Sequence, residues 1–155
     1  MHLAIPGFGA LRLEHLVLDY NGTLAIDGRL IAGVKLRLSR LAASLGVHVI
    51  TADTFGKARG SLRGVECTLQ ILKRGGEDRA KAAYVRRLGA ARVVCIGNGR
   101  NDRLMLRIAA LGIATVQREG AAVEAMQAAD IVVHDVRDAL DLLLVPRRLL
   151  ATLRS

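Results

Sequence analysis

The chain has 155 residues, of which 52% are hydrophobic and 24% are charged, and its formal net charge is +9. This composition excludes a disordered chain and a disulfide-rich scaffold, and the length predicts one domain over residues 1–155. The sequence contains no apolar stretch long enough to span a membrane and no secretory leader at its start. We therefore expect a cytoplasmic protein without a membrane partner.

The positive charge is spread along the chain and is not gathered in one segment. Arg makes up most of the 23 basic residues, whereas only two Phe and two Tyr are present to stack on bases. This pattern argues against a nucleic-acid platform, which combines a basic groove with stacking aromatic side chains. It is compatible with attraction of a phosphorylated substrate.

The first predicted element is a β-hairpin. In "MHLAIPGFGALRLEHL", Pro6, Gly7 and Gly9 separate two apolar pieces, as the turn of a hairpin does. We expect this N-terminal hairpin at the edge of a larger sheet.

Six short apolar runs rich in Val, Ile and Leu follow, and they alternate with segments of helical spacing. Most of the runs are continuously apolar, as in a parallel sheet covered on both faces. Strands are predicted at 15–20, 46–51, 67–72, 92–97, 111–116 and 130–135, and helices at 33–45, 77–89, 101–111 and 120–129. The tail from residue 142 predicts a helix broken at Pro146. The order predicts an α/β fold with a doubly wound parallel sheet, whose ligands bind at the carboxyl ends of the strands.

Polar residues gather directly after three of the predicted strands. They are Asp19, Asn21 and Thr23 after the first, Thr51 and Asp53 after the second, and Asn98, Asn101 and Asp102 after the fourth. Mg²⁺ takes oxygen ligands from one or two carboxylates, which Asp19 and Asp102 can supply beside a phosphoryl group. Lys81, with Arg79 as its alternative, opens a helix and can neutralise phosphoryl charge.

Four motifs in order resemble those of the haloacid dehalogenase (HAD) superfamily, whose members transfer phosphoryl groups through an aspartate. They are "DYNGT", "ITADT", the Lys before "AAYVRRLG", and "GNGRND". Within that superfamily the chain is most similar to small soluble proteins named P-type ATPase-like. The resemblance implies a HAD-like Rossmannoid fold and a Mg²⁺-dependent phosphatase, and it implies no ion pumping because membrane helices are lacking.

The resemblance also assigns a role to each residue of these motifs. Asp19 would attack phosphorus to form an aspartyl-phosphate, and Mg²⁺ would be held by Asp19, the backbone carbonyl of Asn21, and Asp102, with Asn98 nearby. The transferred phosphate would be held by Thr51, Ala52 and Lys81. The supporting residues would be Gly22, Thr23, Asp53 and Asn101.

Two amides depart from the family pattern. HAD phosphatases carry an Asp where this chain has Asn21, and that Asp protonates the leaving group and then activates water. An amide cannot carry a proton in this way, and loss of general acid–base help slows a reaction by about 10²–10⁴-fold. The P-type pattern has a metal-associated Asp where this chain has Asn98, so one negative charge fewer is available to Mg²⁺.

The spacing of the motifs leaves no room for the cap domain that covers many HAD active sites. Only 27 residues separate Thr23 from Thr51, and 29 separate Thr51 from Lys81. The site is therefore expected to be open unless a homo-oligomer covers it, as resemblance to cap-less tetrameric sugar phosphatases suggests. Two alternatives to a phosphatase remain: an autophosphorylating or ATP-hydrolysing protein, and a catalytically degenerate fold that binds a phosphorylated ligand or a protein.

Overall fold

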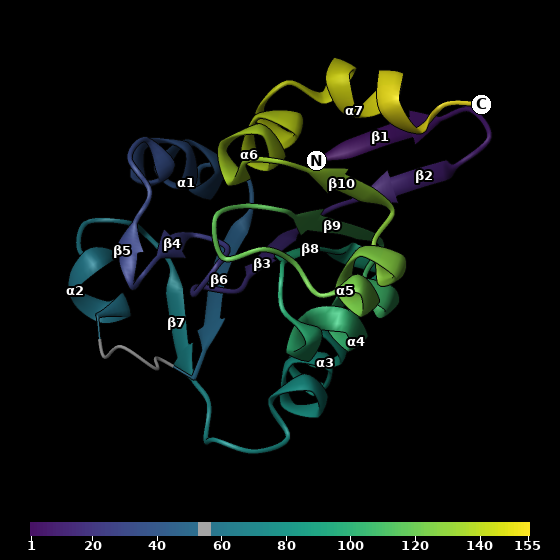
Figure 1. Ribbon diagram of the computed structural model, residues 1–155. Coiled ribbons are helices and arrows are strands. Elements are labelled where there is room, and N and C mark those ends of the chain that lie inside the picture. The colour runs from purple at the N-terminus through teal and green to yellow at the C-terminus, as the bar shows by residue number, and fades with distance from the viewer. Residues whose placement is uncertain (53–56) are drawn as a thin grey trace.

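The computed structural model describes residues 1–52 and 57–155, and its centre is a parallel β-sheet (Figure 1). Six strands of the described residues make this sheet in the order β10-β9-β8-β3-β6-β7, and every neighbouring pair is parallel. Their bounds are β3 His15–Leu18, β6 Gly46–Thr51, β7 Thr68–Ile71, β8 Val93–Gly97, β9 Leu111–Thr115 and β10 Ile131–Val133. The predicted doubly wound α/β fold is confirmed, with each expected strand present.

The N-terminal hairpin is present, but its predicted place at the edge of the large sheet is wrong. Strands β1 (His2–Ile5) and β2 (Gly9–Arg12) pair only with each other and form a separate antiparallel sheet. Two residues connect β2 to β3, and β3 is flanked on both sides by β6 and β8. So short a connection cannot carry the chain from the middle of the sheet to its edge.

The helices cover the two faces of the sheet (Figure 1). One face carries α1 (Val34–Ala42), α6 (Val136–Leu144) and α7 (Pro146–Leu153), and the other carries α3 (Glu77–Leu88), α4 (Arg103–Ile108) and α5 (Val123–Ala128). The continuously apolar strands are buried by both layers, because their alternate side chains point to opposite faces. The tail is helical and interrupted next to Pro146, as predicted.

Two hydrophobic clusters fill the spaces between sheet and helices. The cluster under α1 and α6 includes Leu16, Leu18 and Leu140, and the one under α3 and α4 includes Val17 and Met105. Leu16, Val17 and Leu18 thus point alternately to the two clusters, which fixes β3 in the middle of the molecule. The residue that follows β3 is therefore held by a central strand that is packed on both faces.

Short elements fill the two segments where HAD proteins carry caps. The hairpin of β4 (Ala25–Ile26) and β5 (Arg29–Leu30) lies between Thr23 and Thr51, and helix α2 (Ala58–Ser61) lies between Thr51 and Lys81. Among the described residues, neither segment forms a cap domain. No helix in the described part of the chain has the length and apolar character needed to cross a bilayer.

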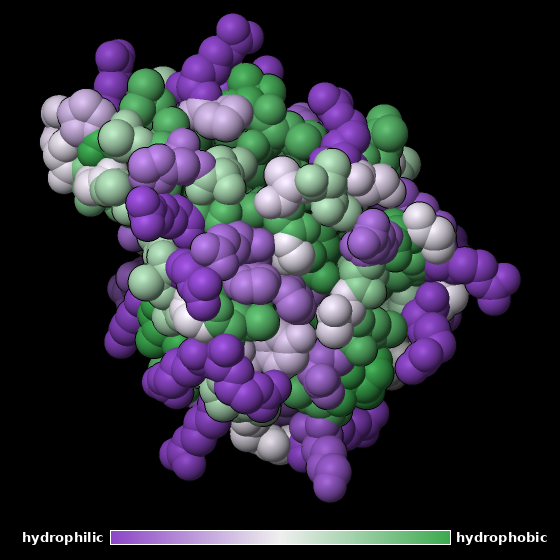
Figure 2. All heavy atoms as spheres, turned by 180° about the vertical axis from the view of Figure 1, so that it is seen from behind, coloured by the Kyte–Doolittle hydropathy of each residue, from purple (hydrophilic) through white to green (hydrophobic). Residues whose placement is uncertain are grey.

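The surface seen from behind carries dispersed hydrophilic side chains. In Figure 2 these side chains project around the whole outline of that face, with smaller hydrophobic areas between them. This dispersion agrees with basic residues that are scattered along the sequence.

Candidate active site

Asp19 occupies the carboxyl end of the central strand β3. Its backbone N–H donates to the carbonyl of Ile96 on β8 (3.0 Å), so the sheet ladder continues to this residue and fixes its backbone. The residue is 6% exposed. Asp19 is thus a carboxylate at the mouth of the sheet that reaches solvent through a small opening.

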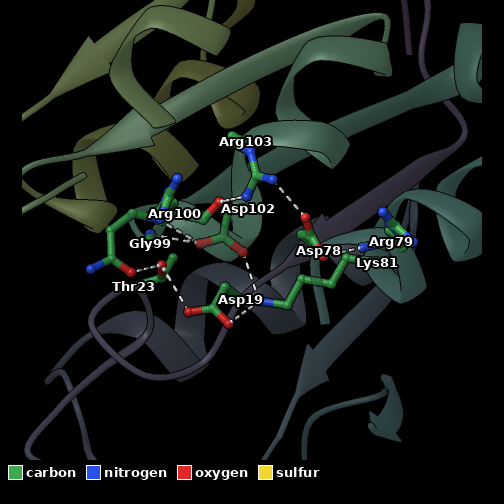
Figure 3. Close-up of polar contacts among 10 residues, drawn as sticks. Asp19, Thr23, Asp78, Arg79, Lys81, Gly99, Arg100, Asp102 and Arg103 are labelled. Atoms are coloured by element: carbon green, nitrogen blue, oxygen red, sulfur yellow. Dashed lines mark hydrogen bonds and ion pairs between the residues drawn. The ribbon is translucent and has the colours of Figure 1, made fainter. Parts of the chain in front are cut away.

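Lys81 connects Asp19 to Asp102 (Figure 3). Its Nζ donates to Asp19 Oδ1 and to Asp102 Oδ1, at 2.6 Å in each case, and Lys81 is 1% exposed. Lys81 lies on the buried face of α3, together with Ala82 and Val85, whereas Arg79 is exposed at the start of the same helix. The structure therefore brings Lys81 to the two carboxylates and leaves Arg79 outside.

Asp102 is held by a tight turn after β8. Its Oδ2 accepts the backbone N–H of Asn98 (3.0 Å) and of Gly99 (2.8 Å), and the residue is fully buried. A Cβ on Gly97 would lie 2.6 Å from Asp102 Cγ, which is closer than real contacts allow. Glycine at position 97 therefore lets the carboxylate fold back over the end of the strand.

The loop after Asp19 is built around Gly22, Thr23 and Asn98. Gly22 has a φ of +77°, and a Cβ there would lie 2.3 Å from Asn98 Nδ2. Thr23 Oγ1 lies 3.1 Å from Asn98 Oδ1 and 3.4 Å from Asp19 Oδ2, so its one hydroxyl hydrogen serves either oxygen. Asn98 Nδ2 donates to the carbonyl of Gly120 (3.1 Å). The Asn98 amide thus ties three loops together beside the Asp19 carboxylate.

Burial and charge set the protonation of this cluster. Burial, with the Asp102 carboxylate adding to it, raises the pKa of Asp19 to about 7, against the opposing effect of Lys81. Burial alone would lower the pKa of Lys81, but the Asp102 and Asp19 carboxylates outweigh burial and raise it above its usual value. Lys81 is therefore an ammonium at any ordinary pH, and Asp19 is the member of the pair whose protonation varies.

The remaining predicted residues lie around this cluster to different degrees. Thr51 is buried at the end of β6, which pairs with β3, and Ala52 follows it half-buried. Asn101 lies in the turn between Gly99 and Asp102, where its side chain covers Gly99. Asp53 lies outside the described residues.

Asn21 presents a buried acceptor to the site loop. Its residue is half-buried, and its Oδ1 has no hydrogen-bond donor among the described residues. Buried polar atoms are normally paired, because leaving one unpaired costs about 1–3 kcal/mol. Asn21 Oδ1 is therefore an acceptor whose hydrogen bond the described residues do not supply.

Sequence reasoning missed Gln117, which braces the loop after Asp19. Its Nε2 donates to the carbonyls of Gly22 (3.0 Å) and Thr23 (2.8 Å), and its Oε1 accepts the N–H of Val136 (2.9 Å). Gln117 lies two residues after the end of β9, and Asp19 lies one residue after the end of β3. The rule that polar residues after strands gather at one edge would have found it.

Sequence reasoning also missed the ion pair that joins α3 to the turn of Asp102. Arg103 Nη2 donates to Asp78 Oδ2 (2.7 Å), and Arg103 Nη1 donates to the carbonyl of Arg100 (2.8 Å) (Figure 3). Asp78 lies in the first turn of the helix that carries Lys81, and Arg103 follows Asp102 directly. The pair thus fixes the relative position of the ammonium and the second carboxylate.

The donor set fits a hard divalent cation. The described residues contain no cluster of three or more His, Cys, Asp or Glu side chains in a metal-binding arrangement. Mg²⁺ does not need one, because one or two carboxylates with carbonyls, water and phosphate oxygens complete its shell. When Asp19 is ionised, the cluster of Asp19, Asp102 and Lys81 carries one net negative charge, which a divalent cation would convert to a positive one.

Comparison with curated proteins places the chain in a family. It is 50% identical over 64 residues to "Uncharacterized protein MJ0073" of Methanocaldococcus jannaschii, a match that spans 41% of this chain and 69% of that protein. The chain belongs to the same family as this archaeal protein. A second protein of the same organism, "Uncharacterized protein MJ0072", is 44% identical over 39 residues, or 25% of this chain and 89% of its own. No protein-family model matches the chain.

Solved structures show that this family member has the HAD fold. A 3-deoxy-D-manno-octulosonate 8-phosphate phosphatase from Moraxella catarrhalis, in complex with magnesium, phosphate and KDO, matches with a TM-score of 0.64 and 17% identity over 86% of each chain. A candidate enzyme of the same kind from Vibrio cholerae reaches 0.72 with 14% identity, covering 95% of this chain and 96% of its own. A candidate HAD superfamily hydrolase of subfamily III A from Legionella pneumophila reaches 0.65 with 19% identity, covering 92% and 87%.

Proposed function

We propose that the chain is a Mg²⁺-dependent phosphohydrolase that forms an aspartyl-phosphate at Asp19. The observation that carries the proposal is the Lys81 ammonium, 2.6 Å from both the Asp19 and the Asp102 carboxylate at the carboxyl end of the central strand of a HAD fold. The solved structure that contains magnesium and phosphate has this fold and is itself a phosphatase. Nucleophile, counter-charge and metal donors are thus within reach of one phosphoryl group.

The proposed reaction has two displacements at phosphorus. An Asp19 carboxylate oxygen attacks phosphorus while the bond to the leaving oxygen breaks, and water then attacks phosphorus and releases Asp19 and inorganic phosphate. The Lys81 ammonium balances charge on the transferring oxygens, and the hydroxyl of Thr51 donates a hydrogen bond to them. The divalent cation, held by Asp19, Asp102 and the Asn21 carbonyl, supplies further neutralisation of phosphoryl charge.

Asn21 decides which leaving groups the proposed enzyme accepts. The amide cannot give a proton to the leaving oxygen, so a poor leaving group departs slowly and takes its proton from water. Its unpaired Oδ1 is an acceptor, which suits a hydroxyl or water that donates a hydrogen bond. We therefore expect acyl phosphates and other esters with good leaving groups to react faster than sugar phosphates.

Compared with the Asp of the P-type pattern, Asn98 weakens binding of the cation but does not abolish it. An amide carries no charge, but its oxygen can still bind a metal directly or through water. In the described structure that amide bonds Thr23 and Gly120 instead, so Asn98 also serves to position the loops. We therefore expect Mg²⁺ to bind more weakly than it would beside a carboxylate at position 98.

A small set of variants tests the proposal. Turnover of acetyl phosphate and of a sugar phosphate is measured with Mg²⁺ and with EDTA for the wild type, Asp19→Asn and Asn21→Asp. We expect Mg²⁺-dependent turnover that favours acetyl phosphate, loss of turnover in Asp19→Asn, and a gain of about 10²-fold or more on the sugar phosphate in Asn21→Asp. Faster wild-type turnover of the sugar phosphate would contradict the role given to Asn21.

The two asparagines also favour the degenerate reading, in which the fold binds a phosphorylated ligand without turnover. That reading predicts binding of phosphate esters with no release of phosphate under any condition. The autophosphorylating reading predicts label from γ-labelled ATP on acid-quenched wild type and none on Asp19→Asn. If a second copy of the chain covers the open site, activity should fall when the protein is diluted to monomer.

A further inference from the structure

A cleft of about 810 Å³ opens beside the candidate active site, and neither Asp19 nor Lys81 lines it. Its walls come from the β4–β5 hairpin, the segments after β9 and β10, and Lys57. This volume lies within the range of small-molecule sites, about 300–1,000 Å³. The cleft is thus large enough for the part of a substrate that is not phosphate.

The cleft presents three cations that form no ion pair with a described carboxylate. Arg29, Lys57 and Arg118 line it, are exposed, and make no ion pair with a carboxylate of residues 1–52 or 57–155. The fourth cation, Arg137, donates to Asp135 (2.9 Å) and forms a neutral pair with it.

The wall of the cleft contains few carboxylates. Asp27 is the other carboxylate in the wall, and it makes no ion pair with a described residue. The Glu119 carboxylate lies next to this wall, where it accepts the N–H of Asp27 (2.7 Å). Three unpaired cations against these two carboxylates still leave an excess of positive charge. Arg and Lys in such a place bind carboxylates and phosphates through charge-assisted hydrogen bonds.

Gln117 joins this cleft to the candidate active site. It lines the cleft, and its Nε2 donates to the carbonyl of Thr23 (2.8 Å). Thr23 in turn places its Oγ1 3.4 Å from Asp19 Oδ2. Only Thr23 therefore lies between the wall of the cleft and the proposed nucleophile, so the cleft and the phosphoryl site are neighbours.

The hairpin turn explains how Arg29 reaches this wall. Asp27 (φ +50°) and Gly28 (φ +72°) form a two-residue turn with both φ angles positive, which matches the right-handed twist of the paired strands. The N–H of Asp27 donates to Glu119 Oε1 (2.7 Å), next to Arg118 in the chain. The hairpin is thus held against the loop that carries the second arginine.

We propose that this cleft binds a second anionic group on the leaving group, so that the substrate is a phosphomonoester that also carries a carboxylate or a second phosphate. This inference rests on the proposed function for the phosphoryl half of the substrate. Arg29 and Arg118 determine specificity through the second anion and take no part in the transfer of the first. The reaction chemistry at Asp19 is unchanged by it.

The test compares substrates that differ by one anionic group. The pairs are glycerol 3-phosphate against 3-phosphoglycerate and glucose 6-phosphate against 6-phosphogluconate, with glucose 1,6-bisphosphate to distinguish a phosphate from a carboxylate. The value of kcat/KM is measured with Mg²⁺ for the wild type, Arg29→Ala and Arg118→Ala. The matched control is Arg147→Ala, which removes the same charge from an exposed position of α7 outside the cleft.

We expect the wild type to favour an anionic member of at least one pair by tenfold or more. In Arg29→Ala and in Arg118→Ala that preference falls by about tenfold, as loss of one charge-assisted hydrogen bond implies, and in Arg147→Ala it is unchanged. The proposal is overturned by equal kcat/KM within every pair, or by an equal fall in Arg147→Ala, which would make it an effect of net charge.

A second measurement separates this inference from the proposed function. If no compound is turned over, binding of the same compounds is measured by calorimetry on the wild type and Arg118→Ala. Tighter binding of the anionic member that is lost in Arg118→Ala supports the cleft although the phosphatase proposal fails. Equal binding of both members contradicts the cleft whatever the enzyme does.

Discussion

The buried cluster at Asp19 and the cleft beside it differ in how their charged groups are paired and buried. In the cluster, one ammonium contacts two carboxylates at 2.6 Å and is almost completely removed from solvent. In the cleft, Arg29, Lys57 and Arg118 stand exposed without partners among the described residues. Buried, paired groups are fixed in direction and suit chemistry at one atom, whereas exposed, unpaired groups remain available to a ligand. The buried cluster is therefore suited to the reaction, and the cleft is suited to recognition of the substrate.

The strongest way to break the buried cluster is Lys81→Met, which keeps the length of the side chain and removes its charge. The variant leaves Asp19 and Asp102 buried without a counter-charge, and removal of one partner from a buried ion pair costs about 3–5 kcal/mol. We expect a fall of that size in the free energy of unfolding, measured by urea denaturation in EDTA. Arg79→Met, on the exposed side of the same helix, should change it little, and equal losses in both would contradict the account.

Gly22 joins the two regions, because it contacts Asn98 on one side and its carbonyl accepts from Gln117 on the other. In Gly22→Ala the new methyl group meets the Asn98 amide, and the positive φ adds strain, so we expect a loss of about 1–3 kcal/mol. Gly60→Ala is the matched control, since nothing lies within 4 Å of a Cβ there. A denaturation midpoint that is the same for both variants would show that the loop adapts freely.

The cleft should respond to loss of a charge with almost no change in stability. Arg118→Ala removes an exposed cation that has no ion-pair partner in the described chain, so we expect the free energy of unfolding to stay within about 0.5 kcal/mol of the wild type. Thermal unfolding measures this on the protein used for the substrate pairs. A loss as large as that of Lys81→Met would place Arg118 among structural residues and remove the contrast between the regions.

A weaker effect, on the pH dependence of stability, is expected at His48. This residue lies on β6 between His15 and Tyr84. Burial, and then His15, lowers the pKa of His48 from its usual 6.5. The folded state therefore prefers neutral His48, so this contribution to stability is present above pH 6.5 and is lost as the pH falls through that lowered pKa. Between pH 8 and pH 5, the free energy of unfolding should fall more steeply for the wild type than for His48→Gln. The same pH dependence in both proteins would contradict this role of His48. His2→Gln, at an exposed position, serves as the control.

Much of the fold and the buried cluster could be predicted from the sequence, because both depend on rules of short range. Continuous apolar runs give strands, and the parallel order brings the residues after them to one edge of the sheet. Asp19 and Asn98 follow such runs directly, and Asp102 lies in the turn after the same run as Asn98. Lys81 was predicted to open a helix, whereas the structure places it in the second turn of α3, on its buried face.

The cleft and the place of the first hairpin depend on contacts between distant segments. Arg29, Lys57 and Arg118 become neighbours only when the β4–β5 hairpin lies against the loop after β9, and no spacing in the sequence expresses that contact. One signal was present, because "AIDGRL" holds the Asp-Gly pair of a tight hairpin between apolar residues. The place of the first hairpin depends on the strand order, because its two-residue connection leads to a strand in the middle of the sheet.

The central claim is that phosphoryl transfer passes through Asp19. The most direct measurement is the mass of the acid-quenched protein after it has been mixed with acetyl phosphate and Mg²⁺, followed by mapping of the modified peptide. The account predicts one added phosphoryl group on the peptide that contains Asp19 and none in Asp19→Asn. Hydrolysis of acetyl phosphate that continues in Asp19→Asn, or a phosphoryl group on another residue, would contradict it.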